Sequence, residues 1–187
     1  MLAYVFWHWQ QPGIDRDAYV DHQRAFQQTL AANKPSGFQR SAVFRINGAS
    51  WLNNNGEAYE DWYVVDDSAA LDPLNDGAVS GACAEPHNRV AREAADGTAG
   101  LYRLRAGIEN LAQATYAVWL SKPAGISYAD FYAAMEAITS QPGVALWGRQ
   151  MTLGPTTEFC LQSPAPIQLP QGYFGLTISL ELIWPQI

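Results

Sequence analysis

The chain has 187 residues, of which 48% are hydrophobic and 12% are aromatic. This length is sufficient to bury a core without disulfides or metals, and so many rings must fill a core, line a pocket or cover an interface. Acidic residues outnumber basic ones and the net charge is -7, so neither a nucleic acid nor an anionic membrane is expected as a partner.

The first residues predict a strand. The segment from Met1 to His8 is apolar and carries no basic leader, and Gln10, Gln11 and Pro12 end it before it could act as a signal peptide or cross a bilayer. The two cysteines, Cys83 and Cys160, form no CxxC pair, so neither a disulfide framework nor a zinc knuckle is indicated. We therefore expect a cytoplasmic protein.

The chain contains an internal repeat. A shift of 112 positions, which is the difference between Ile126 and Ile14, aligns YVFWHWQQPGIDRDAY with YAVWLSKPAGISYADF. Each segment has an aromatic, β-prone run, a Pro/Gly turn, a short polar residue suited to an N-cap (Asp15 or Ser127) and then a helical pattern. The repeat predicts a strand that leads into a helix, twice.

The first half continues with a strand pair, a helical region and a last strand. A helix is predicted from about Arg16 to about Leu30, with Tyr19, Gln23, Phe26 and Leu30 near one stripe. The further expected elements are strands over 38–46 and 59–65, helical stretches over 68–79 and 87–95, and a strand over 100–105.

The second half follows the same order until its last helix. A helix over 128–139 is expected to precede strands over 144–153, 158–161 and 176–184, with a hairpin at 154–157. Pro164, Pro166 and Pro170 make a regular helix improbable between Ser163 and Gly172. The second unit is therefore predicted to lack its last helix and to have an extended loop there.

This organisation predicts an α+β protein made of two βαββαβ units of the ferredoxin-like kind, over residues 1–106 and 107–187. Each unit would form an antiparallel sheet with helices on one face, and the two sheets could bury their open faces against each other. The paired layout resembles the dimeric α/β-barrel superfamily. The segments PGIDRDAY and PAGISYADF are similar to the helix start of its EthD-like and antibiotic-biosynthesis-monooxygenase-like members.

The resemblance implies a cavity between sheet and helices that holds a hydrophobic small molecule. That superfamily includes cofactor-free oxygenases, isomerases, cyclases and haem-binding enzymes. EthD-like members carry a His further along the first helix than His22, where this chain has Phe26, so no family catalytic residue is transferred. Haem versions commonly take their axial His from the second unit, and no His occurs from Ala106 onward. No cofactor is therefore expected.

His8 is the first acid-base candidate. Strand alternation puts Tyr4, Phe6 and His8 on one face and Val5, Trp7 and Trp9 on the other. If the Tyr4 face meets a cavity, His8 could accept or donate a proton near neutral pH. The alternative is a structural His, bonded to backbone or half exposed. His22 is expected in solvent and His87 near a helix start, and neither is assigned a role.

Glu60 and Asp61 are the second acid-base candidates. They lie in a polar and aromatic run with Trp62, opposite the strand that carries Arg40 and Arg45. The structural interpretation is an ion pair across the sheet. The functional one is a carboxyl group that points into the cavity without its Arg, where desolvation would raise its pKa and make it a base.

Trp147 and Arg149 place a ring and a cation close together in the second unit, which suits an anionic aromatic ligand. The alternative is an Arg that packs over its neighbouring Trp. No short His, Asp, Glu or Cys spacing indicates a metal site. Signatures of dinucleotide, P-loop, α/β-hydrolase and zincin sites are absent.

Two functions from different classes follow. In the first, the protein binds a small apolar or aromatic molecule and transforms it as a cofactor-free monooxygenase or isomerase, with His8, Glu60 and Asp61 as acid-base residues. Its predicted ligand-binding residues are Tyr4, Trp7, Arg45, Trp62, Trp119, Trp147 and Arg149. In the second, a non-catalytic binding or assembly module uses the same rings to fill its core. A barrel closed within one chain allows a monomer, and exposed outer surfaces also allow a homodimer.

Overall fold

The computed structural model describes residues 1–54 and 56–185 and contains one continuous antiparallel sheet. The elements of the first half are β1 (Leu2–Gln10), α1 (Arg16–Asn33), β2 (Phe38–Asn47), β3 (Glu57–Val65), α2 (Leu71–Val79), α3 (Ala84–Glu93) and β4 (Ala94–Gly107). Those of the second half are β5 (Tyr116–Leu120), α4 (Tyr128–Thr139), β6 (Ala145–Arg149), β7 (Phe159–Ser163), β8 (Gly175–Ser179) and β9 (Glu181–Trp184). Short 3-10 turns at Ser68–Ala70, Gly81–Cys83 and Leu111–Gln113 connect some of them.

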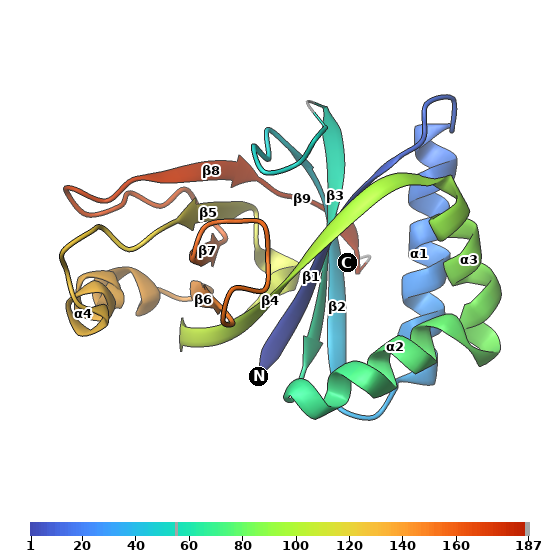
Figure 1. Cartoon of the computed structure of the whole chain (residues 1–187), viewed down its shortest axis with the longest axis horizontal. Helices are drawn as coiled ribbons and strands as arrows, with labels where there is room; N and C mark the ends of the chain where they lie inside the picture. Colours follow the sequence, from blue (N-terminus) through green and yellow to red (C-terminus); the bar gives the residue numbers. More distant parts are fainter. Residues whose placement is uncertain (55, 186–187) are drawn as a thin grey trace.

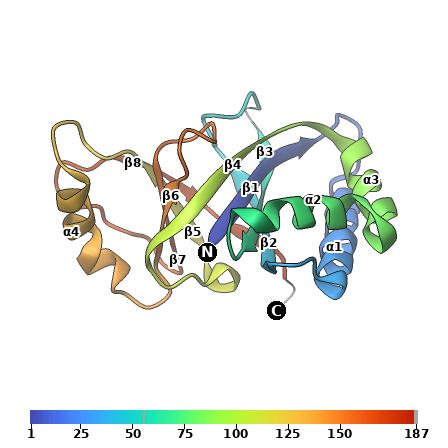
Figure 2. The same ribbon diagram turned by 60° about the horizontal axis from the view of Figure 1, so that its bottom comes forward.

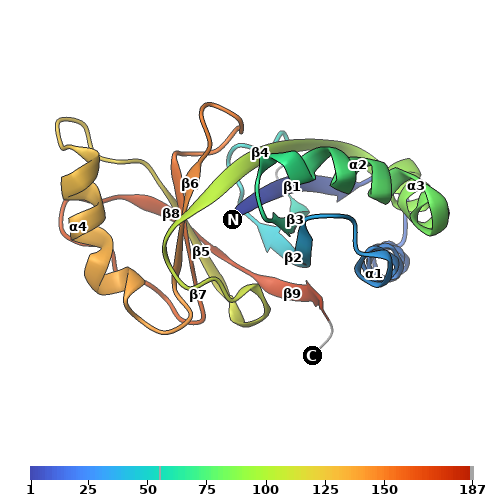
Figure 3. The ribbon, with the colours of Figure 1, turned by 90° about the horizontal axis from the view of Figure 1, so that it is seen from below.

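The strands of the two halves are arranged alike. The sheet order is β8-β5-β7-β6-β4-β1-β3-β2-β9, so each half places its fourth, first, third and second strands side by side in that order. Strand β6 joins the halves by pairing with β4. At the other edge β9 pairs with β2, and only Leu180 separates β9 from β8. The sheet therefore closes on itself as a barrel, with α1, α2 and α3 at one end and α4 at the other (Figure 1, Figure 3).

Strand alternation divides the side chains between two environments. On β1, Ala3, Val5 and Trp7 point into the barrel. Trp7 belongs there to a cluster of five large rings, which we call the barrel ring cluster. Its members are Trp7, Trp62, Tyr102, Trp119 and Trp147. The other face of β1, with Tyr4 and Phe6, packs toward α1, α2 and α3 in a second core. A third core lies between α4 and the sheet of the second half.

The repeat recognised in the sequence has the same local geometry in both copies. Gly13 and Gly125 have φ angles of +90° and +85°, a region that glycine adopts without steric cost. The side chain of Asp15 accepts a hydrogen bond from the Ala18 amide at 2.9 Å, and that of Ser127 accepts one from the Asp130 amide at 3.1 Å. Both first helices therefore begin at an N-cap that follows a glycine turn.

Most of the expected elements are present with shifted ends. The helix over 128–139 and the absence of a helix between Ser163 and Gly172 are as predicted. The strand expected over 144–153 is shorter, because Met151 takes a positive φ of 55° and turns the chain. The helix expected over 87–95 begins earlier, at Ala84, and gives way at Ala94 to a long β4 that crosses between the two halves (Figure 2). The last strand is interrupted at Leu180, where its pairing changes from β5 to β2.

Candidate functional site

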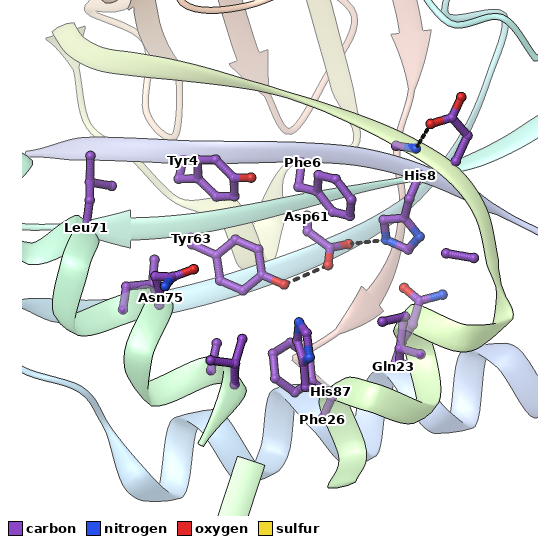
Figure 4. Close-up of a pocket in the computed structure, with 18 of the residues that line it drawn as sticks. Tyr4, Phe6, His8, Gln23, Phe26, Asp61, Tyr63, Leu71, Asn75 and His87 are labelled. Carbon is purple, nitrogen blue, oxygen red and sulfur yellow. Dashed lines mark hydrogen bonds and ion pairs between the residues drawn. The ribbon is translucent and has the colours of Figure 1, made fainter. Parts of the chain in front are cut away.

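A cavity of about 650 Å³ lies between the outer face of the sheet and the helices α1, α2 and α3 (Figure 4). We call it the helix–sheet cavity. The sheet contributes Tyr4, Phe6, His8, Asp61 and Tyr63, which project from β1 and β3. The helices contribute mainly apolar side chains and a few polar ones, including Gln23, Phe26, Leu71, Asn75, His87 and Val90. Its size and mixed lining are typical of sites for small organic molecules.

A buried polar network forms the sheet side of this cavity. His8 is 1% exposed, and its Nε2 lies 3.2 Å from Oδ1 of Asp61. Its Nδ1 lies 2.7 Å from the hydroxyl oxygen of Tyr19 on α1. The other oxygen of Asp61 accepts hydrogen bonds from the Tyr63 hydroxyl at 2.9 Å and from the Gln27 amide at 3.3 Å. The imidazole and the carboxyl group are thus held in one orientation and can share a proton between them.

Aromatic rings fix the position of His8 further. The rings of Phe6 and Tyr59 stack on the imidazole, with centroid distances of 5.2 and 5.6 Å and interplanar angles of 19° in both cases. These side chains share the outer face of the sheet, because Phe6 is two residues away on β1 and Tyr59 is the cross-strand neighbour of His8. The site is preorganised by the sheet itself.

The hydroxyl groups around Asp61 stay protonated at neutral pH. Burial raises the pKa of Tyr63 well above its usual value, and the nearby Asp61 charge raises it further. Burial followed by the Asp61 charge also raises the pKa values of Tyr19 and Tyr4. The protonated hydroxyl groups of Tyr63 and Tyr19 form hydrogen bonds with Asp61 and His8, respectively, and do not act as bases.

Glu60 lies on the opposite face of β3, inside the barrel. It is fully buried, and its two carboxyl oxygens accept hydrogen bonds from the indole nitrogens of Trp7 at 2.7 Å and Trp62 at 2.6 Å. Desolvation raises its pKa to about 7, although both indole bonds favour the charged form. Glu60 and Asp61 are adjacent in the sequence, but Glu60 lies inside the barrel and Asp61 lines the helix–sheet cavity.

The four tryptophans assigned to ligand binding also lie inside the barrel. Trp7, Trp62, Trp119 and Trp147 are at most 1% exposed and contact one another edge to face or tilted. Strand alternation directs them away from the helix–sheet cavity, so the structure does not bring them together with His8. Of the ring residues predicted to bind ligand, Tyr4 alone lines that cavity.

The arginines have other partners than expected. Arg45 binds Glu181 on β9 and lies 3.7 Å from Glu57, and Arg40 binds Glu109. Among the described residues neither contacts Glu60 or Asp61, so the ion pair considered across β2 and β3 does not form there. Arg149 lies at the barrel rim, where it lines a second hollow of about 690 Å³ with Trp51 and Thr156. Trp147 does not line this hollow, so Arg149 and Trp147 do not share a ligand site there.

Several residues that line the cavity were not predicted from the sequence. His87, which was assigned no role, lines the cavity and packs edge to face with Phe26 at 5.5 Å. Gln23 was placed on the inward stripe of its helix but not in the site. Its position between Tyr19 and Gln27, at intervals of four residues, was the signal that could have found it. His22 lies outside this lining and pairs with Glu93 at 2.8 Å.

Neither a metal centre nor a membrane span is indicated by the described part of the chain. No group of three or more His, Cys, Asp or Glu side chains within it has a geometry suited to a metal ion. No helix in residues 1–54 and 56–185 is both long and apolar enough to cross a bilayer.

Comparisons with known proteins identify the fold. No protein-family model and no curated protein matches the sequence. Among solved structures, a candidate monooxygenase from Fusobacterium nucleatum subsp. nucleatum is 10% identical with a TM-score of 0.62, covering 97% of this chain and 92% of its own. An anthrone oxidase-like protein is 8% identical with a TM-score of 0.51, covering 100% of this chain and 94% of its own. These neighbours are dimeric α/β-barrel proteins, and the chain described here has the dimeric α/β-barrel fold.

Proposed function

We propose that this protein binds a small aromatic molecule in the helix–sheet cavity and oxygenates it without a cofactor. The observation that carries the proposal is the buried His8–Asp61 pair on the wall of a mainly apolar cavity of about 650 Å³. An apolar cavity with a few convergent polar groups is the usual form of a site for such ligands. The names of the two neighbours, a candidate monooxygenase and an anthrone oxidase-like protein, agree with this reaction class.

The proposed role of the pair is to remove a proton from an activated carbon or a phenol. Asp61 meets the substrate and accepts its proton. The imidazole of His8 lies beside Asp61, so that the two groups can share this proton. The resulting electron-rich anion reacts with molecular oxygen. For a methylene group the balance is CH₂ plus O₂ giving C=O plus H₂O, with the substrate carbon oxidised and oxygen reduced.

The surrounding hydroxyl groups support this role. Tyr63 and Gln27 donate hydrogen bonds to Asp61 and fix the orientation of its carboxyl group, and Tyr19 orients His8. Glu60 is not part of the proposal, because it lies inside the barrel on the other face of β3.

Oxygen consumption with anthrone as the substrate tests the proposal. We expect uptake of one O₂ per anthrone above the uncatalysed rate, and a loss of about 100-fold for Asp61→Asn, since an acid-base group contributes at least this factor. Asp21→Asn is the matched control, because Asp21 is 71% exposed on α1 and pairs only with Arg24 in the described structure. It should retain the wild-type rate.

Two results would argue against oxygenation. Exchange of substrate protons with deuterated solvent in the absence of oxygen uptake would favour an isomerase. Saturable binding with neither uptake nor exchange would favour the non-catalytic binding module, in which the barrel ring cluster serves only as a core.

A further inference from the structure

Gln23 is a buried amide whose polar atoms have no partner in the described structure. Gln23 is 2% exposed, and among the described residues neither its Oε1 nor its Nε2 has a hydrogen-bond partner. Figure 4 shows it below the ring of His8, with the amide directed from α1 toward the sheet. Burying an amide without a partner is costly, so such a group in a native protein calls for an explanation.

The polar residues next to Gln23 on the same face of α1 do have hydrogen-bond partners, unlike Gln23. Tyr19 and Gln27 lie four residues before and after it on the same face of the helix. Tyr19 contacts His8, and Gln27 donates to Asp61 and Tyr63 while accepting from Ser41. Gln23 lies between these two anchored residues, and it also lines the cavity. Its amide therefore lies opposite the His8–Asp61 pair with both hydrogen-bonding functions available.

We infer that Gln23 is the residue that positions the ligand, by binding an acceptor and a donor on adjacent atoms of a flat aromatic molecule. This inference rests on the proposed function and adds the ligand class. A primary amide offers a donor and an acceptor side by side, and its complement is a group such as a cyclic amide or an enol next to a carbonyl. A ligand held in this way would have its polar edge beside Asp61, where the proton is removed.

Two isosteric bicyclic probes test the inference in binding experiments. Isocarbostyril, a lactam, presents N–H and C=O side by side, while the corresponding lactone isocoumarin has a ring oxygen in place of the N–H. We expect the wild-type protein to bind the lactam about tenfold more tightly, because the lactone leaves the Gln23 oxygen without a donor. In Gln23→Met, which keeps the side-chain volume, this preference should fall to about one.

A second measurement separates positioning from a structural role. Removing a buried amide that has no partner should raise the thermal midpoint of the ligand-free protein by about 3 °C, while lactam binding weakens. Gln28→Met is the control, because Gln28 is exposed on the same helix. It should change neither the midpoint nor the preference.

The possible failures are distinguishable. If the wild-type protein binds neither probe, the proposed aromatic site is wrong and the inference falls with it. If both probes bind but the lactam preference is absent, or persists in Gln23→Met, the site stands and Gln23 does not position the ligand. A lower midpoint for ligand-free Gln23→Met would mean that water or another group already satisfies the amide, which also overturns the inference.

Discussion

Glu60 and Asp61 are adjacent in β3 and have opposite surroundings. Asp61 faces α1 and is bound by His8, Tyr63 and Gln27, whereas Glu60 faces the barrel ring cluster and is bound by two indoles. Because successive side chains of a strand point to opposite faces, one carboxyl group belongs to the cavity and the other to the core. The orientation of the strand therefore decides which of two adjacent polar residues can reach a cavity.

Glu60 should titrate near neutral pH. Its pKa is raised from an ordinary 4.5 to about 7, so between these values the unfolded chain releases a proton that the folded protein keeps. The stability that this proton contributes is complete below about pH 4.5 and is lost as the pH rises to about 7, by about 3 kcal/mol in total. The indole ¹H–¹⁵N signals of Trp7 and Trp62 should follow the same titration. A midpoint near 4.5 in these signals would show that the site is hydrated.

Gln27 provides a stability test at the same scale. Its amide is fully buried and has hydrogen bonds to Asp61, Tyr63 and Ser41, so Gln27→Met should cost about 2 kcal/mol, since it leaves these groups short of a partner. Chemical denaturation measures the change, with Gln28→Met as the exposed control. An unchanged free energy of unfolding would mean that water replaces the amide at no cost.

At the scale of elements, the strand-to-helix junction is the feature that recurs. Gly13 and Gly125 both take a left-handed conformation, and both are followed two residues later by an N-cap, Asp15 or Ser127. This local chemistry is readable from the chain because turn glycines and caps act within a few residues. Element ends were less predictable where pairing decides them, as in the early start of β4 at Ala94.

Alanine substitutions at the two glycines should have equal effects. A Cβ atom at Gly13 or Gly125 would meet nothing within 4 Å in the described part of the chain, so the cost comes from the backbone conformation alone, about 1 kcal/mol in each case. Gly56→Ala is the control, because Gly56 has no left-handed φ. A Cβ atom added there would lie 3.4 Å from Oδ1 of Asn54. Thermal or urea unfolding measures all three. Clearly unequal losses at Gly13 and Gly125 would show that the two junctions are not equivalent.

At the scale of the whole molecule, the second half completes the environment of the site in the first half. Strand β9 pairs with β2, and its Ile183 is 4% exposed in a core with Tyr19, Val43 and Tyr59. Tyr19 in turn contacts His8. The barrel ring cluster also combines rings from both halves. Both features predict that the chain unfolds as one unit, although its repeat suggested two.

Ile183→Ala tests this coupling. We expect a loss of about 3 kcal/mol from the cavity left in the core, and a single transition that coincides by tryptophan fluorescence and far-UV circular dichroism. Ile108→Ala is the control, since Ile108 is 74% exposed and should change stability by less than about 0.5 kcal/mol. Two separate transitions would support independent units over 1–106 and 107–187.

The sequence by itself determined the α+β class, the repeated strand-to-helix junction, the missing last helix and the alternation that puts Tyr4, Phe6 and His8 on one face. These follow from interactions within a few residues, such as strand periodicity, capping and the ring constraint of proline. Only the tertiary structure decided which face meets the cavity, that Asp61 and His8 pair across strands, and that the tryptophans fill the barrel. Those outcomes depend on how the sheet closes and which helices cover it, which are long-range contacts that no local pattern encodes.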